Sequence, residues 1–161
     1  MLINVFFSFH IEQDSWRANV VKNNWLSQNR RSAAGFWDTS VWEQTKREGS
    51  EATRCMIDEQ LENSSVTAVL IGRETADEDS VKYAIQRSYE LHHGMFGLVI
   101  HGIPDQSGNL EESGRNPLNE VYVRDDDGIP VPASRLFPTC NWVLNDGHNN
   151  FATWVEKARS D

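Results

Sequence analysis

Polar side chains with catalytic or binding potential follow three apolar runs of the sequence. Ser8 and His10 end the first run, residues 37 to 40 end the second, and residues 72 to 75 end the third. His10 could act as a general base or position a ligand, although a lone histidine at such a place more often makes an ordinary hydrogen bond. Ser8 has no base near it in the sequence and lies in no GxSxG motif, so it is a weak candidate nucleophile. These groups form a site only if the fold brings them together.

Three long apolar runs predict the sheet that would do so. Residues 3 to 9, 66 to 72 and 95 to 103 are apolar without simple alternation, which is typical of strands buried on both faces of a parallel sheet. A shorter run at residues 33 to 40 is predicted to hold the second strand. Ligands of such sheets bind beyond the carboxyl ends of the strands, so the polar groups above are expected to converge there.

Helical periodicity separates the predicted strands. A first helix is expected from Ser15 to Gln28 after a cap at Asp14 or Ser15, and a second after Gly49. A third, which follows Asp79, and a closing helix near the C-terminus complete the pattern. The predicted buried positions of the four helices are, in chain order, Trp16, Val20 and Leu26; Ala52, Met56, Ile57 and Leu61; Val81, Ala84, Ile85 and Ser88; and Phe151, Trp154, Val155 and Ala158.

Residues 104 to 138 interrupt this alternation. They are rich in Gly, Pro and acidic residues, and we predict an irregular insertion with one short strand at residues 120 to 123. The remaining order, β-α-β-α-β-α-β, predicts a right-handed wound α/β domain that spans residues 1 to 161, with a parallel sheet flanked by helices.

The net charge and the lengths of the apolar runs limit which partners the chain can have. The chain has 24 acidic and 15 basic residues and a net charge of -9, which argues against nucleic acid, because its binding depends on clustered Lys and Arg. A small anionic ligand needs only a few donors, such as Arg17, Arg31 or Arg73. The N-terminus lacks the basic leader of a signal peptide, and no run approaches the roughly 20 apolar residues that span a bilayer. We therefore expect a cytoplasmic protein without membrane contact.

Familiar cofactor and metal motifs are missing from the sequence. No GxGxxG opens a helix and no P-loop is present. Cys55 and Cys140 form no CxxC pair, and the adjoining His92 and His93 resemble capping residues at a helix end. No metal site and no cofactor are predicted.

Four stretches together resemble the TIR-domain protein of the Thoeris anti-phage defence system. They are VFFSFH at residues 5 to 10, SAAGFWDTSVWE at 32 to 43, NSSVTAVLIGRETADEDSVKYAI at 63 to 85, and NWVLNDGHNNFATWV at 141 to 155. The resemblance implies a flavodoxin-like TIR fold that acts on NAD as a substrate. Such proteins release nicotinamide and produce an ADP-ribose-derived signal, often a cyclic isomer, which activates a separate effector. A phage-derived trigger and a homo-oligomer are further partners that the sequence leaves open.

Convergence of the strand ends and the resemblance together predict the ligand site. An aromatic ring and backbone N–H groups are expected to supply most of its contacts. The predicted ligand-binding residues are Phe7, Ser8, Phe9, His10, Ala34, Gly35, Trp37, Asp38, Ser40, Arg73, Thr75 and Tyr83.

The sequence departs from the family pattern at the decisive place. In the family that the sequence resembles, this helix starts with the pattern W-V-x-Y-E-I, and its Glu is catalytic. Here Ser80 stands in place of the Trp and Ala84 in place of the Glu. Cleavage of the bond between nicotinamide and ribose passes through an oxocarbenium-like state, which a nearby carboxylate stabilises. Alanine offers no such group, so this chain is expected to be inactive. Replacement by engineering fits the otherwise intact motifs, whereas the loss of the Trp fits natural drift.

Other acids could stand in for the missing carboxylate. Glu90 should face elsewhere on the helix, and Glu74, Glu78 and Asp79 precede the helix, where only a particular loop conformation would bring one inward. Asp38 is the better outside candidate, although a turn-capping role is its simpler explanation. Two other classes of function stay open: a TIR module that binds a partner without catalysis, and a flavodoxin-like nucleotide-binding protein unrelated to defence.

Overall fold

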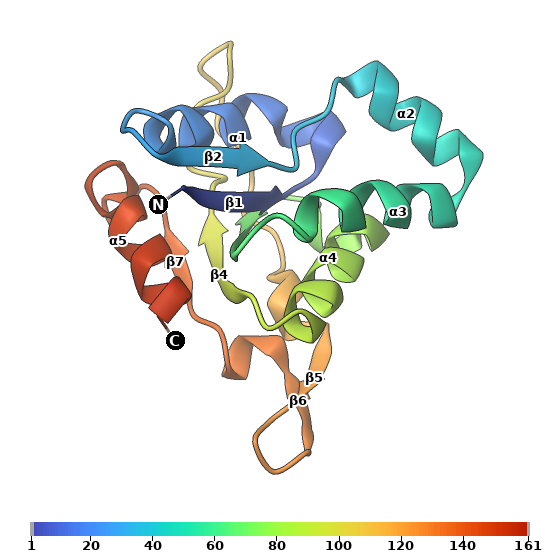
Figure 1. Cartoon of the computed structure of the whole chain (residues 1–161). Helices are drawn as coiled ribbons and strands as arrows, with labels where there is room; N and C mark the ends of the chain where they lie inside the picture. The colour runs from blue at the N-terminus through green and yellow to red at the C-terminus, as the bar shows by residue number, and fades with distance from the viewer. Residues whose placement is uncertain (1, 161) are drawn as a thin grey trace.

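The computed structural model describes residues 2–160 and has the flavodoxin-like α/β fold. Five parallel strands form the sheet in the order β2-β1-β3-β4-β7 (Figure 1). Along the chain these sheet strands follow the flavodoxin-like order 2-1-3-4-5, which reverses direction between β1 and β3. Their bounds are β1 (Ile3–Ser8), β2 (Arg31–Ala34), β3 (Val66–Ile71), β4 (Gly94–Val99) and β7 (Thr139–Asn141).

The central strands explain why the apolar runs lack alternation. Every residue of β3 is buried, and β3 pairs in parallel with β1 on one side and with β4 on the other. Helices cover both faces, so the two sets of alternating side chains are both in the core. The runs at residues 3 to 9 and 66 to 72 form β1 and β3 as predicted. The run at residues 95 to 103 forms a strand only as far as Val99.

Four longer helices pack on the two faces of the sheet (Figure 1). α1 contacts α5, and α3 contacts α4. Phe151 of α5 lies 5.9 Å from the ring of Phe7 and 6.0 Å from that of Trp25, which ties α1, α5 and the sheet into one apolar cluster. The bounds are α1 (Ile11–Trp25), α3 (Ser50–Leu61), α4 (Asp79–Glu90) and α5 (Gly147–Ser160).

The first helix begins earlier than the sequence pattern suggested. α1 starts at Ile11, because the Nδ1 atom of His10 accepts a hydrogen bond from the backbone N–H of Gln13 at 3.1 Å and caps the helix. The predicted cap at Asp14 or Ser15 is therefore wrong. So is the predicted face, since Trp16 is 48% exposed and Leu26 is 40% exposed. The residues of α1 that are buried are Ile11, Asp14, Arg17, Ala18, Val21 and Trp25.

The later helices follow the pattern more closely. Val81, Ala84, Ile85 and Ser88, the predicted face of α4, are its four buried residues. In α3 only Ile57 and Leu61 are buried, while Phe151 and Val155 are buried in α5.

A helix that the sequence reasoning missed lies between β2 and α3. α2 (Thr39–Glu48) buries only Trp42 and Thr45, which is too sparse a stripe to identify a helix from periodicity. The second strand was consequently placed too late, since β2 ends at Ala34 and residues 39 and 40 are helical. Gly49 separates α2 from α3 with φ +115°, a backbone conformation that favours glycine.

The insertion at residues 104 to 138 is a packed element. It contains an antiparallel hairpin of β5 (Tyr122–Arg124) and β6 (Pro130–Pro132), and the short 3-10 turns η2 (Pro117–Asn119) and η3 (Ala133–Arg135). β5 confirms the short strand predicted there; β6 was not predicted. The hairpin and turns bury apolar side chains against Val69, Ile71, Val81 and Ile85, in a second core cluster. None of the helices within residues 2–160 is long and apolar enough to cross a membrane.

Candidate functional site

A cavity of about 870 Å³ lies between the α2–α3 pair and the segment that follows β3. That segment consists of η1 (Thr75–Asp77) and the first turns of α4. The volume is in the range of pockets that hold a nucleotide-sized ligand. Its lining residues are Trp42, Lys46, Gly49, Ser50, Thr53, Arg54, Ile57, Asp77, Glu78, Asp79, Ser80, Lys82, Tyr83, Gln86, Glu120 and Val121.

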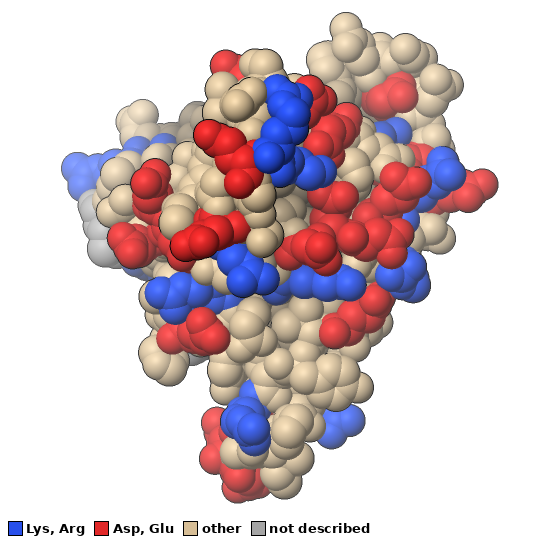
Figure 2. All heavy atoms as spheres, turned by 90° about the vertical axis from the view of Figure 1, so that its right-hand side faces the viewer, with Lys and Arg blue, Asp and Glu red and all other residues tan. Residues whose placement is uncertain are grey.

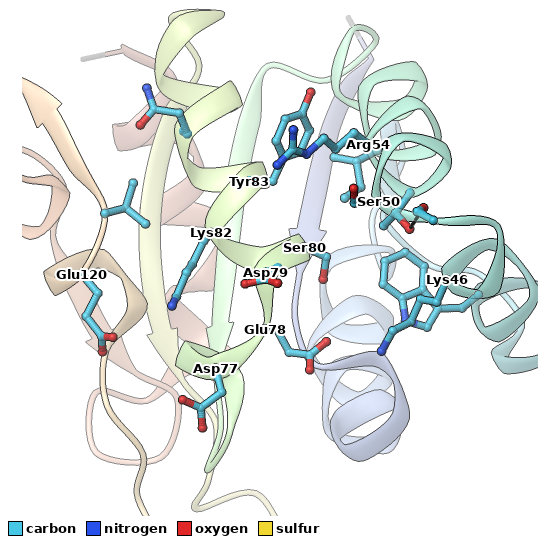
Figure 3. A pocket seen from close by; sticks show the side chains of 16 residues that line it. Lys46, Ser50, Arg54, Asp77, Glu78, Asp79, Ser80, Lys82, Tyr83 and Glu120 are labelled. Carbon is cyan, nitrogen blue, oxygen red and sulfur yellow. Dashed lines mark hydrogen bonds between the residues drawn. The ribbon is translucent and has the colours of Figure 1, made fainter.

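The two walls of the cavity differ in charge (Figure 3). Lys46 and Arg54 come from α2 and α3. On the other side, Asp77, Glu78 and Asp79 come from η1 and the start of α4, and Lys82 of α4, the single cation among the described residues of that wall, leaves it with a net negative charge. A ligand with both a cationic and an anionic part could match the two walls at once. Acidic and basic side chains also lie intermixed over the surface on this side of the molecule (Figure 2).

His10 links the first strand to the acidic wall. Its Nε2 atom lies 3.4 Å from Oε1 of Glu78, and its Nδ1 atom lies 3.6 Å from Oε2 of Glu12. The three side chains bring possible metal-ligand atoms within 4.8 Å of one another. However, Nδ1 accepts the N–H of Gln13, so in the neutral ring Nε2 carries the proton and faces the carboxylate. The arrangement favours a histidine–carboxylate pair over a metal site.

Lys46 joins the same group of charges from α2. Its Nζ atom lies 3.2 Å from Oε1 of Glu12. Burial acts to lower the pKa of Lys46, but the hydrogen bond to Glu12 and the charges of Glu78, Glu12 and Glu43 outweigh it, so the pKa is raised. Lys46 therefore presents a positive charge at the mouth of the cavity near neutral pH.

Ala84 lies in a small apolar recess beside the cavity. Its side chain is 1% exposed, and the recess is lined by residues of β1, the β2–α2 loop and α4. Trp37 stacks on Trp42 with ring centroids 5.5 Å apart and closes one side. Trp42, Ile57 and Ser80 line both the recess and the cavity, so the two spaces adjoin. A side chain longer than alanine at position 84 has almost no free volume in this conformation.

About half of the predicted ligand residues lie around this recess and cavity. Phe7, Ser8, Phe9, Gly35 and Trp37 line the recess together with Ala84. Tyr83 lines the cavity and donates a hydrogen bond to Asp58 at 2.7 Å. His10 does not line the cavity itself, but its Nε2 atom lies 3.4 Å from Glu78, which does.

The other predicted ligand residues lie apart from these spaces. Arg73 is exposed, and its backbone N–H binds Glu111. Thr75 is fully buried and accepts the N–H of Gly72, which is a structural role. Asp38 and Ser40 are exposed at the start of α2, where Asp38 makes no side-chain cap. Ala34 packs against the core at the end of β2.

The sequence reasoning missed the residues that give the cavity its charge. Lys46 and Trp42 depend on α2, which was not predicted, and Arg54 was not singled out on α3. Glu78 was considered, and the turn of η1 is the conformation that brings it to His10. The spacing of Trp42 and Lys46 at i and i+4 is the signal that places both on one helical face.

A second charged group lies near the carboxyl end of β3, around Asp14. The Asp14 side chain is fully buried, and Nη1 of Arg17 lies 3.5 Å from its Oδ1 and 3.6 Å from Oε2 of Glu111. Arg17 also donates to the carbonyl oxygens of Ile103 and Asn109. Burial, then the charge of Glu111 and its hydrogen bond, raise the pKa of Asp14 to about 7, although Arg17 acts in the opposite direction. This group anchors the insertion to α1.

Two comparisons with known proteins agree with the fold. The family model described as "Thoeris protein ThsB, TIR-like domain" matches residues 6–105 and so ends where the insertion begins. A curated protein of Bacillus cereus (strain MSX-D12), named "Putative cyclic ADP-D-ribose synthase ThsB1", is 31% identical over 191 aligned positions, which cover 96% of this chain and 100% of that protein. The chain therefore belongs to the TIR-like family of the Thoeris protein ThsB.

Proposed function

We propose that this protein binds NAD, or a nucleotide derived from it, in the charged cavity and serves in Thoeris antiviral signalling. The observation that carries the proposal is the pair of oppositely charged walls beside the recess of Ala84. NAD has a cationic nicotinamide and an anionic diphosphate, so it matches such walls better than a uniformly charged ligand does. The name of the Bacillus cereus relative, a synthase of cyclic ADP-D-ribose, supports the same substrate class.

Cleavage of NAD by this chain is proposed to be slow. The oxocarbenium-like transition state needs a carboxylate close to the ribose, and Ala84 provides only a methyl group at the family's catalytic position. In active relatives the product would be an ADP-ribose-derived, often cyclic, signal that reaches a separate effector. Here the protein would hold the nucleotide with little release of nicotinamide.

A second candidate is an enzyme that uses Glu78 in place of the missing glutamate. The observation that favours it is the 3.4 Å separation of Glu78 Oε1 from His10 Nε2 at the edge of the cavity. A histidine at this distance can orient a carboxylate. Glu78 lines the cavity and Ser80 borders both spaces, so a ligand near the recess would also lie near Glu78.

The test combines binding and turnover. NAD and ADP-ribose are titrated calorimetrically, and nicotinamide release is followed by chromatography with and without lysate of phage-infected cells. The chains are the present one, Ala84→Glu, its uncharged isostere Ala84→Gln, and Glu78→Gln. We expect the present chain to bind nucleotide with background release. Ala84→Glu should raise release by about 10²- to 10³-fold, the usual effect of one preorganised electrostatic group, and Ala84→Gln should not.

Three outcomes would change the assignment. Nicotinamide release by the present chain that Glu78→Gln abolishes would establish the second candidate. Failure of both NAD and ADP-ribose to bind would favour a TIR module that recognises a partner protein. Silence of Ala84→Glu under activating conditions, with nucleotide binding intact, would remove position 84 from the catalytic assignment.

A further inference from the structure

The α3 helix begins at the wall of the cavity without a side-chain cap. Its N-cap residue is Gly49, which has no side chain to accept a hydrogen bond from the first turn. Gly49, Ser50 and Thr53 all line the cavity. The first backbone N–H groups of a helix lack intrahelical partners and carry part of the positive end of the helix dipole. α3 has 12 residues, so this dipole is well developed.

A buried donor without an acceptor lies in the same wall. Trp42 is 1% exposed, lines the cavity, and its indole Nε1 has no hydrogen-bond partner among residues 2–160. A buried N–H without an acceptor costs free energy, so an incoming acceptor atom is favoured there. Lys46 lies one turn further along α2, and its side chain is 44% exposed.

Two cations complete this side of the cavity. Arg54, one turn into α3, stacks over the ring of Tyr83 at 5.1 Å and forms no ion pair with any described residue. Lys46 forms an ion pair with Glu12, with 3.2 Å between Nζ and Oε1. The acidic residue of the first turn of α3, Glu51, does not line the cavity. Two cations and the helix N-terminus thus lie together on the α2–α3 wall, opposite a wall in which Lys82 is outnumbered by the carboxylates of Asp77, Glu78 and Asp79 (Figure 3).

We propose that the N-terminus of α3, with Arg54, Lys46 and the indole N–H of Trp42, is the subsite for the diphosphate of the bound nucleotide. The inference rests on the proposed function for the identity of the nucleotide and adds its orientation. The diphosphate lies against the α2–α3 wall, and the cationic nicotinamide riboside end lies toward Glu78 and the recess of Ala84. This orientation places the scissile bond on the acidic side of the cavity.

The first experiment detects the subsite without turnover. The isotope-labelled chain is titrated with inorganic pyrophosphate, ADP-ribose and adenosine while the indole N–H resonances of its six Trp are followed by NMR. The Trp42 signal is assigned by its loss in Trp42→Phe. Pyrophosphate and ADP-ribose should shift the Trp42 signal and slow its exchange with solvent, whereas adenosine, which lacks phosphate, should not. Shifts confined to other indoles, or no binding of either phosphate compound at millimolar concentration, would overturn the subsite.

Variants test the donors separately. Arg54→Gln should weaken the binding of pyrophosphate and of ADP-ribose about tenfold, the usual effect of one charge-assisted hydrogen bond. Arg47→Gln is the matched control on α2, because Arg47 is exposed, lies outside the cavity lining and donates a hydrogen bond to Gln44. Ser50→Pro removes a backbone N–H at the first helical position, which tolerates proline, and Ser50→Ala removes only the hydroxyl. Weaker binding in Ser50→Pro than in Ser50→Ala is expected.

The outcomes separate the subsite from the function. Pyrophosphate binding that depends on Arg54 and Ser50, in a chain that neither binds nor cleaves NAD, would support the subsite and refute the proposed function. NAD binding that is unchanged in both Arg54→Gln and Ser50→Pro would support the function and refute the subsite.

Discussion

Two buried positions near the carboxyl edge of the sheet differ in whether they hold a carboxyl group. Asp14 is completely buried and keeps its carboxyl group, whereas the position at which the resemblance predicts a glutamate holds Ala84, which is nearly as inaccessible. Around Asp14 lie the guanidinium of Arg17 and the carboxyl group of Glu111. The lining of the recess around Ala84, as far as the structure describes it, consists of aromatic and aliphatic side chains with Ser8, Gly35 and Ser80, and it contains no cation.

The difference teaches what a buried acid requires in this fold. Even with Arg17 beside it, Asp14 has a pKa raised to about 7 by burial and by Glu111. Its protonated and ionised forms are therefore nearly equal in free energy at neutral pH. A carboxylate in the recess would have no such partner and would cost more. A catalytic glutamate at position 84 is therefore a source of strain on the folded state, which binding of a cationic substrate could relieve. The alanine removes that cost together with the proposed catalysis.

Ala84→Glu places a carboxyl group in the recess and should have the largest effect on stability of the variants that test this contrast. We expect it to lower the free energy of unfolding by about 3 kcal/mol at neutral pH, since it places an unpaired carboxylate and extra volume in an apolar recess. Burial holds the pKa of such a carboxyl above its unfolded value of about 4.3, so the native state binds the proton more tightly and the loss should shrink as the pH falls. Urea denaturation across this range measures it.

Ala84→Gln is the control for volume, because the amide has the size of the acid and no charge. The difference between the two variants isolates the charge, and only that difference should depend on pH. Equal stability of the Glu and Gln variants at every pH would mean that the recess admits water or a cation. The contrast with Asp14 would then fail.

Much of the fold was predictable because the central elements obey simple periods. β1 and β3 are buried on both faces and appear as unbroken apolar runs, and α4 carries its whole apolar face at helical spacing. α1 was misplaced because two of its buried positions are Asp14 and Arg17, a charged pair inside what periodicity expects to be an apolar stripe. α2 was missed because it buries only Trp42 and Thr45.

The site was predictable only on the side that the strands determine. Residues such as Phe7, Ser8 and Gly35 lie at strand ends, and parallel topology alone brings them to the recess beside Ala84. The charges of the cavity come from two helices and a 3-10 turn whose relative placement depends on tertiary packing. The turn of η1 that carries Glu78 to His10 has no signature in the local sequence. Lys46 and Arg54 likewise meet the cavity only because α2 and α3 bend at Gly49.

Asp14→Asn should sharpen the comparison with an intermediate effect. In the folded chain the pKa of Asp14 is about 7 rather than its ordinary 3.8, so the native state binds this proton more tightly than the unfolded state. The stabilising contribution is complete at low pH and is lost as the pH rises from about 4 through 7, with a slope of up to about 1.4 kcal/mol per pH unit. Asp14→Asn should flatten this part of the stability profile.

The measurement is the free energy of unfolding by urea at several pH values, with Asp126→Asn as the control at an exposed turn position. The control should leave the slope unchanged. A wild-type profile that is already flat between these pH values would show that Arg17 fully compensates the burial of Asp14.

The smallest effect is expected at Asp58, a carboxylate that is paired and half-exposed. The Tyr83 hydroxyl donates to Oδ1 of Asp58 at 2.7 Å, and Nε of Arg87 lies 3.4 Å from the same oxygen. Tyr83→Phe removes one hydrogen bond but leaves Asp58 with Arg87 and with water, so the expected loss of stability is about 1 kcal/mol or less. Burial, then the hydrogen bond and charge of Asp58, raise the pKa of Tyr83 to about 12, so its phenolate should be absent until the most alkaline part of an ultraviolet titration. A loss as large as that of Ala84→Glu would mean that pairing and solvent access do not set the cost of a carboxylate here.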